Sequence, residues 1–112
     1  MTDNQNSPRY AVIFRSRRTP DEAGYAEMAT RMEEQVRQQP GFLDLTSFRA
    51  PDGTGVTISY WNSLEAIRAW KQHPEHITAQ QLGKDKWYAH YTVEIAKIES
   101  VYHFPSPADP GR

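Results

Sequence analysis

The segment from Trp61 to Tyr91 holds the side chains best suited to chemistry. It contains all three tryptophans of the chain and three of its four histidines. Indole rings form apolar walls for a small ligand, and histidine is the side chain that most readily gains or loses a proton near neutral pH. The same residue types also build ordinary cores, so a ligand pocket and a packed interior are both open interpretations.

His76 and Gln80 stand four residues apart in this segment. On a helix that spacing places both side chains on one face, with Lys84 one further turn along. A neutral histidine can accept a proton from a phenol or an enol, while a glutamine amide donates a hydrogen bond to the same ligand. We therefore predict that His76 is a catalytic base and that Gln80 is a catalytic, orienting donor. The alternative is that His76 lies at the surface, packing on Trp70 or capping a helix end.

His73 stands three residues before His76, with Pro74 between them. Because the sequence offers no clear third ligand, we predict no metal site. His73 is a candidate substrate contact. Its alternative role is structural, since a ring before a proline can bond a free carbonyl or lie near the negative end of the preceding helix.

The composition excludes several classes of partner. The 112 residues carry 13 basic and 14 acidic side chains, interspersed, for a net charge of -1, so the chain offers no strong field to nucleic acid. The absence of cysteine excludes disulfides, thiol catalysis and thiolate metal sites. No stretch approaches the roughly 20 apolar residues of a membrane span, and the first residues lack a signal-peptide pattern. We expect no nucleic acid, no membrane and a cytoplasmic location.

The hydrophobic pattern predicts the elements that position these residues. Residues 10–15 favour a strand with apolar side chains on both faces. Residues 19–22, Thr-Pro-Asp-Glu, are typical of a capped helix start, and an apolar stripe continues from there to Val36. The Gln-Pro-Gly sequence at residues 39–41 ends this helix.

The middle of the chain predicts a hairpin followed by a broken helix. Residues 42–50 and 56–61 favour strands, joined by a turn rich in proline, aspartate and glycine. The helix opens at Asn62 or Ser63. It must break at Pro74, because proline disfavours helical backbone at the residue before it.

The last third predicts a second helical segment and a long strand. Residues 75–82 form the helical segment, which Gly83 ends. Residues 87–104 form the strand, in which the apolar positions change parity. A bulge near residues 95–97 would reconcile the two halves.

The element order is βαββαβ, which predicts an α+β fold with a ferredoxin-like antiparallel sheet and helices on one face. The first and the last strand carry apolar residues on both sides, yet helices would cover only one face of the sheet. We therefore expect a second copy to cover the other face, sheet to sheet, in a homodimer. We expect the domain to span residues 9–104. Disordered tails are expected at residues 1–8 and 105–112, which are polar or rich in proline.

Several features of this domain together match a known family. They are the turn Gln39-Pro40-Gly41-Phe42, the strand end Tyr60-Trp61, then Ser63, Glu65, Ala66, Trp70, His73, His76, Gln80, Gly83, Trp87-Tyr88 and Tyr102. With them the chain resembles the antibiotic biosynthesis monooxygenase family over about Arg9 to Phe104. The resemblance implies a dimeric α/β barrel made of two ferredoxin-like sheets. It is less specific for the reaction, because the family includes quinone-forming monooxygenases, haem-degrading enzymes and quinol oxidases.

Two branches of this family can be compared residue by residue. In the polyketide-oxidising branch, a pocket tryptophan matches Trp61, whereas the asparagine and tyrosine of that pocket correspond to Thr57 and Ile67. Those enzymes need no metal or flavin, because a deprotonated phenol can itself reduce oxygen. In the haem-degrading branch a tryptophan matches Trp70, but Gln80 stands where the iron-binding histidine is expected, which disfavours that route.

We therefore predict a cofactor-independent monooxygenase-like enzyme for a small aromatic, phenolic or quinol-type substrate, with molecular oxygen as co-substrate. Its predicted substrate contacts are Thr57, Trp61, Trp70 and His73. The alternatives are a non-catalytic dimeric module for a small ligand and a haem-binding protein that uses His73 or His76. A closed cavity beside the second helix would support the enzyme hypothesis, whereas a space filled by Trp70 and Met32 would weaken it.

Overall fold

The computed structural model describes residues 9–105, and it contains four strands and a set of helices. In chain order these are β1 (Tyr10–Arg18), α1 (Tyr25–Val36), β2 (Phe42–Arg49), β3 (Thr54–Trp61), α2 (Leu64–Lys71), α3 (Pro74–Leu82), the π-helical turn η2 (Gly83–Trp87) and β4 (Tyr88–Lys97). The expected disordered tails lie outside the described residues, apart from Pro105.

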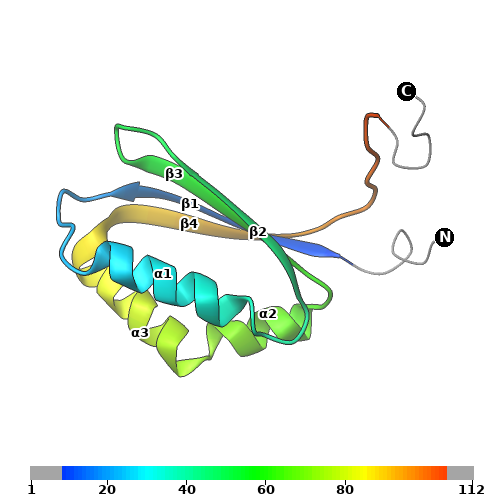
Figure 1. The fold of residues 1–112 in the computed structure, drawn as a ribbon, viewed down its shortest axis with the longest axis horizontal. Coiled ribbons are helices and arrows are strands. Elements are labelled where there is room, and N and C mark those ends of the chain that lie inside the picture. The colour runs from blue at the N-terminus through cyan, green and yellow to red at the C-terminus, as the bar shows by residue number, and fades with distance from the viewer. Residues whose placement is uncertain (1–8, 106–112) are drawn as a thin grey trace.

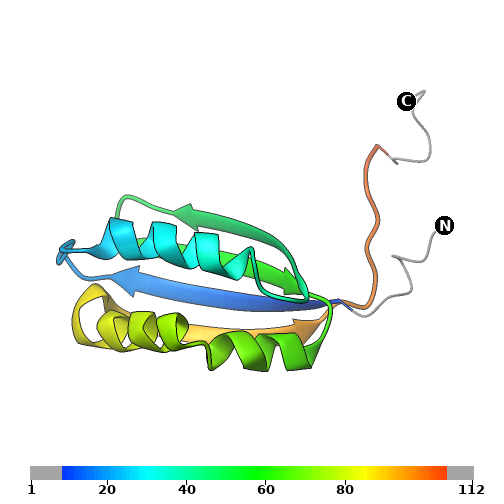
Figure 2. The same cartoon turned by 60° about the horizontal axis from the view of Figure 1, so that its bottom comes forward.

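The strands form one antiparallel sheet in the order β2-β3-β1-β4. Figures 1 and 2 show α1, α2 and α3 on the same side of this sheet, with α1 beside the α2–α3 pair. This arrangement confirms the predicted α+β, ferredoxin-like fold. None of the helices in the described part of the chain is long and apolar enough to cross a membrane.

The two faces of the sheet differ in what covers them. Tyr10 and Val12 of β1 pack against buried residues of the helices, so this parity of β1 faces the helix layer. The alternate residues Ala11 and Ile13 therefore lie on the face without helices. The pairing of β3 with β1 places the apolar residues Val56, Ile58 and Tyr60 on the same bare face. Strand β1 is thus apolar on both sides, and cover by a second copy stays a prediction.

The core lies between the helices and the beginning of β1. Trp61, at the end of β3, is 1% exposed, and its indole N–H donates to Ser59 Oγ over 2.9 Å. The Phe42 ring meets it edge-on at 5.5 Å between centroids. Val36, Ile67 and Trp70 complete this buried cluster. The cluster ties α1 and α2 to the sheet through apolar contact alone.

The predicted break in the second helix is confirmed. Ser63 Oγ accepts the Ala66 N–H over 3.0 Å and caps α2, which ends at Lys71. Pro74 is then the first residue of α3, a position where its missing N–H has no cost. The chain therefore turns between two short helices at His73.

The predicted start of the first helix is wrong. The helix begins at Tyr25 and not at residues 19–22, and Gly24 precedes it with a left-handed φ of 78°. Thr19 does not cap a helix, because its hydroxyl donates to the Lys86 carbonyl and accepts the Asp21 N–H. A contact with a residue 67 positions away outweighs the local capping pattern.

The predictions for the last third of the chain are partly confirmed. The second helical segment, α3, ends at Leu82 with Gly83 as its C-cap, as predicted, and the π-helical turn η2 then continues to Trp87. The last strand is shorter than the predicted 87–104, because it stops at Lys97, which pairs with Tyr10 at the beginning of β1. The irregularity in β4 lies opposite Arg17 and Arg18, at the other end from residues 95–97.

Candidate functional site

His76 lies in the first turns of α3 and stacks on Trp70 of α2. The two ring centroids are 4.6 Å apart, with 17° between the planes. Within residues 9–105, His76 Nδ1 is the one buried side-chain nitrogen or oxygen that has no hydrogen-bond partner. Burial lowers the pKa of His76 below its ordinary value of 6.5, against a smaller opposing effect of the Trp70 and Lys71 backbone. The imidazole is therefore neutral at neutral pH, and one of its nitrogens is unused.

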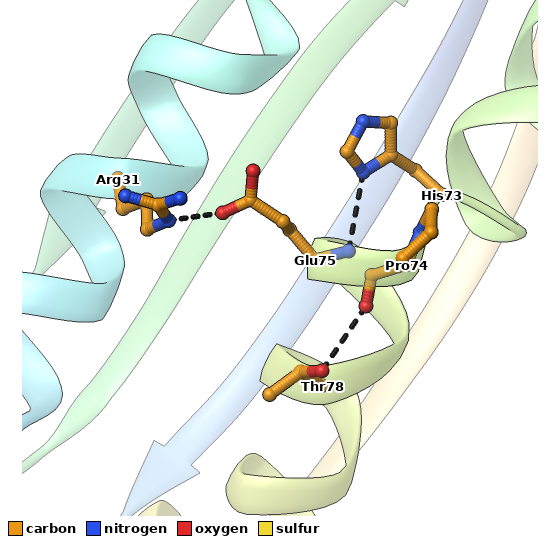
Figure 3. A network of polar contacts seen from close by, with 5 residues as sticks. All are labelled: Arg31, His73, Pro74, Glu75 and Thr78. Carbon is orange, nitrogen blue, oxygen red and sulfur yellow. Dashed lines mark hydrogen bonds and ion pairs between the residues drawn. The ribbon is translucent and has the colours of Figure 1, made fainter.

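His73 has a different position and a partner of its own. Its Nδ1 accepts the Glu75 N–H over 3.2 Å and so caps the start of α3 (Figure 3). The sequence indicated a carbonyl or the negative end of the preceding helix as its neighbour, and the structure instead gives it a backbone N–H at the following helix. Its ring also lies 5.2 Å from that of Trp70. Trp70 is thus flanked by two imidazoles, of which one is engaged.

A short polar network fixes this end of α3 against α1. Arg31 of α1 forms an ion pair with the Glu75 carboxylate, and Thr78 Oγ1 donates to the Pro74 carbonyl over 3.1 Å (Figure 3). The Arg31 side chain is 60% exposed, so such a pair contributes about 1 kcal/mol or less to stability. Its value here is geometric, because it holds the helix turn that carries His73 and His76.

The two tryptophans predicted to be pocket walls belong to the core. Trp61 is 1% and Trp70 is 9% exposed, and Met32 packs against the same cluster. The space beside the beginning of α2 is therefore filled by side chains. Thr57 lies four residues before Trp61, about 13 Å along the strand, where its hydroxyl is 2.7 Å from that of Ser47. The structure brings His73, His76 and Trp70 together but leaves Thr57 apart from them.

Two hollows lie between the helices. One of about 420 Å³ is lined by Met28, Arg31, Pro74, Glu75 and Thr78. The other, of about 360 Å³, lies along the beginning of α1 and the end of α3, and Trp87 forms part of its wall. Both open widely to solvent. His76 lines neither, because at about 100° per residue it lies on a different side of α3 from Glu75 and Thr78.

The helix layer leaves the inner side of β4 partly uncovered. Val93 pairs with Phe14 and Ile95 with Val12, so both face the helices, yet they are 50% and 52% exposed. Helix α1 lies over the opposite half of the sheet from α3 (Figure 2). Gln80 is half-buried and one helical turn beyond His76. Val93 and Ile95 therefore form an apolar, accessible strip on the helix-facing side of β4.

A second aromatic cluster lies at the other end of the helix-facing side. The Tyr88 ring meets those of Phe14, Tyr25 and Tyr91 edge-on, with centroids 5.2 to 6.1 Å apart. The Trp87 indole N–H donates to the Ala23 carbonyl over 3.0 Å. In the sequence, Trp87-Tyr88 stood out only as a family marker. The alternation of apolar residues in the two strands indicates that Phe14 and Tyr91 each lie on an apolar face. It does not reveal that Tyr25 of α1 packs with them.

No group of three or more histidine, aspartate or glutamate side chains in residues 9–105 is arranged to hold a metal ion. The candidate site therefore consists of the buried His76 imidazole of α3, which has a nitrogen without a hydrogen-bond partner. It lies between two aromatic clusters on the helix-facing side of a ferredoxin-like sheet. Residues 9–82 match the family model described as antibiotic biosynthesis monooxygenase. The chain belongs to this family, which places it among monooxygenase-like proteins.

Three similar proteins illustrate this relationship. The uncharacterized protein YqjZ of Bacillus subtilis is 46% identical over 92 residues, which cover 82% of this chain and 81% of YqjZ. SnoaB of Streptomyces nogalater, a cofactor-independent oxygenase, shares the fold with a TM-score of 0.68 and 19% identity over 89% of this chain and all of its own. Jasmonate monooxygenase ABM of Pyricularia oryzae is 22% identical over 80% of this chain, which spans 43% of that protein's length.

Proposed function

We propose that the protein is a cofactor-independent monooxygenase for a small aromatic, phenolic or quinol-type substrate, with molecular oxygen as co-substrate. Family membership supports the monooxygenase class. The similar fold of SnoaB, described as a cofactor-independent oxygenase, and the name of the jasmonate monooxygenase relative point in the same direction. The proposal assigns no metal and no flavin to the reaction.

One observation carries the assignment of the site, namely the unpartnered Nδ1 of His76. Burial keeps the pKa of His76 low, so the ring is unprotonated and able to accept a proton. Because Nδ1 is buried, the proposed reaction requires neighbouring side chains to move on substrate binding, and Nδ1 then takes the proton of the substrate hydroxyl. The resulting phenolate is electron-rich enough to reduce oxygen. One oxygen atom enters the ring to give a quinone, and the other leaves as water with two hydrogens of the substrate.

The other site residues are assigned by their positions around His76. Gln80 donates its amide to the substrate from one turn further along α3. Trp70 and His73 contact the ring of the substrate from the α2 side. Trp61 and Thr57 are the remaining proposed contacts, both on the helix-facing side of β3. A contact with Trp61 requires a neighbouring side chain to move, because Trp61 is 1% exposed.

The proposal includes a second copy of the chain. The bare face carries apolar residues of both central strands, such as Ile13 and Ile58, which pair with each other across β1 and β3. Burying this surface between two sheets would form a closed barrel of the family type. A cytoplasmic location is part of the same proposal.

Oxygen consumption with a panel of phenols and quinols tests the function. We expect the purified chain to consume oxygen without added metal or flavin, and we expect His76→Ala to lower kcat about 100-fold or more. The matched control is His103→Ala, which removes an exposed histidine outside the helices and strands. Full activity in both His76→Ala and Trp61→Phe would contradict the site assignment.

A non-catalytic binding module is the second candidate. It is favoured by the packing of Trp61, Trp70 and Met32, which fill the interior next to α2. Such a module would bind the same phenols and raise the melting temperature, yet consume no oxygen. Turnover of any member of the panel that depends on His76 rules this candidate out.

A further inference from the structure

Arg49 lies where β2 ends, on the helix-facing side of the sheet. Its Nη2 donates to Ser16 Oγ over 3.1 Å and its Nη1 to the Gly53 carbonyl over 2.7 Å. Ser16 is 5% exposed, which is unusual for a serine, and its buried hydroxyl accepts the hydrogen bond that fixes the guanidinium. Arg49 itself is exposed. A positive charge is thus held in one position at the surface.

Arg18 places a second guanidinium at the same end of the sheet. Its Nε donates to the Trp87 carbonyl over 3.0 Å and its Nη2 to the Asp21 carbonyl over 2.9 Å. The guanidinium carbon lies 3.3 Å from the centroid of the Tyr25 ring. The Arg18 backbone N–H donates to the Gly53 carbonyl, the same oxygen that Arg49 uses. One carbonyl therefore connects the two arginine residues.

Two phenol side chains lie beside these charges, Tyr25 in contact with the Arg18 guanidinium and Tyr88 next to Tyr25. The Tyr88 hydroxyl lies 3.4 Å from that of Tyr25, which is long for an O–H···O hydrogen bond. Burial, followed by the Tyr25 hydroxyl, raises the pKa of Tyr88, while the charges of Arg49 and Arg18 act in the opposite direction. Both guanidinium groups are therefore within electrostatic reach of the Tyr88 hydroxyl, which stays protonated and able to donate.

The charges of this cluster are not balanced within the described part of the chain. The ion pairs found there are Arg15–Glu94, Arg31–Glu75 and Arg37–Glu33, and neither Arg18 nor Arg49 takes part. The groups that hold these two guanidinium groups are carbonyl and hydroxyl oxygens, which fix their orientation without neutralising them. Fixed guanidinium groups next to phenol donors are complementary to a planar oxyanion.

We propose that Arg18, Arg49, Tyr25 and Tyr88 form a binding site for the carboxylate of a small organic acid. Ser16 belongs to the site because its hydroxyl holds the Arg49 guanidinium in position. We call these five residues the acid site. The carboxylate accepts hydrogen bonds from Arg49 and from the Tyr88 hydroxyl, and Arg18 adds a second positive charge. The acid site lies at the opposite end of the helix-facing side from the Trp61 cluster. It does not depend on the oxygenase reaction.

Calorimetric titration of the full chain with benzoate and with neutral benzamide tests this site. We expect benzoate to bind at least about tenfold more tightly than benzamide, because only benzoate carries the charge. Arg49→Gln should weaken benzoate about tenfold or more and leave benzamide unchanged. Tyr88→Phe, which keeps the ring and removes one donor, should weaken benzoate by a smaller factor, and Arg49→Lys should restore part of the loss.

Arg17→Gln is the matched control, because it removes a neighbouring positive charge on the opposite face of β1. It should change benzoate affinity less than twofold. Equal binding of benzoate and benzamide, or equal losses in Arg17→Gln and Arg49→Gln, would overturn the proposal. If circular dichroism shows that Arg49→Gln does not fold, Arg49→Lys and Tyr88→Phe decide by the same comparison. Oxygen consumption is measured separately, so either proposal can fail without the other.

Discussion

The two ends of the helix-facing side are built from similar rings but in different ways. At one end Trp61 is 1% exposed, its indole N–H is satisfied by Ser59, and its neighbours are apolar. At the other end Tyr88 is surrounded by three rings, yet its hydroxyl has a long contact to Tyr25 and two unneutralised arginine residues nearby. The first end is a closed core, and the second keeps polar groups available.

His76 lies between these ends and combines features of both. It is stacked on a core tryptophan as a packing residue would be, but its Nδ1 lacks a partner. A buried polar atom without a partner costs stability, about 1–3 kcal/mol in typical cases. The comparison indicates that stability is concentrated at the Trp61 end, whereas the polar groups that we propose for ligand chemistry lie in the middle and at the Tyr88 end.

The largest effect should come from the closed end. Trp61→Ala removes the most buried large side chain and should cost about 3–5 kcal/mol of unfolding free energy. Urea denaturation followed by circular dichroism measures this loss. A cost below about 1 kcal/mol would mean that the Trp61 cluster is not the core of the fold.

The pH dependence of stability sharpens the position of His76. Because its pKa is lower in the folded than in the unfolded protein, the unfolded state binds more protons, and stability falls as the pH drops below 6.5. In His76→Gln this contribution is absent. Urea midpoints of both proteins are measured from about pH 8 to about pH 5. The wild-type midpoint should fall toward acidic pH relative to that of His76→Gln. A constant difference across the range would show that His76 is not buried in its neutral form.

A helix cap gives a smaller effect. Ser63→Ala removes the side chain that accepts the Ala66 N–H, and it should cost about 1 kcal/mol. Thr19→Ala serves as the comparison, since Thr19 bonds Lys86 and Asp21 and does not cap α1. Loss of α1 helicity in Thr19→Ala, seen by hydrogen exchange of residues 25–36, would contradict this difference.

The smallest change in stability is expected at the polar end. Tyr88→Phe keeps the ring contacts and removes a hydroxyl whose hydrogen bond is long, so unfolding free energy should change by less than about 1 kcal/mol. Thermal and urea unfolding provide the measurement. A loss as large as that of Trp61→Ala would show that both ends have the same structural role.

The features predicted correctly from the sequence are those that depend on neighbouring residues. Ser63 caps the helix that follows it, and Pro74 breaks the helix before it, because both effects act within a few residues. The alternation of β1 likewise gave the two apolar faces and hence the sheet. These local signals sufficed for the fold class and for the element order.

The errors and omissions concern partners that are distant in the sequence. Thr19 has the local pattern of a cap but bonds Lys86, and the end of β4 depends on where β1 begins. The contact between Arg49 and Ser16 joins residues 33 positions apart, so no motif announces it. The pairing of Trp70 with His76 was recognised as an alternative, but which imidazole nitrogen stays free requires the packed structure.

The central claim is that the free nitrogen of His76 accepts a hydrogen bond or a proton from a bound phenol. Nitrogen NMR of histidine-labelled protein tests it directly, in a titration with hydroquinone under exclusion of oxygen so that the ligand is not consumed. We predict that the Nδ1 resonance of His76 shifts on binding while the resonances of the exposed His103 stay in place. Binding of hydroquinone that leaves the His76 resonance unchanged would contradict the account.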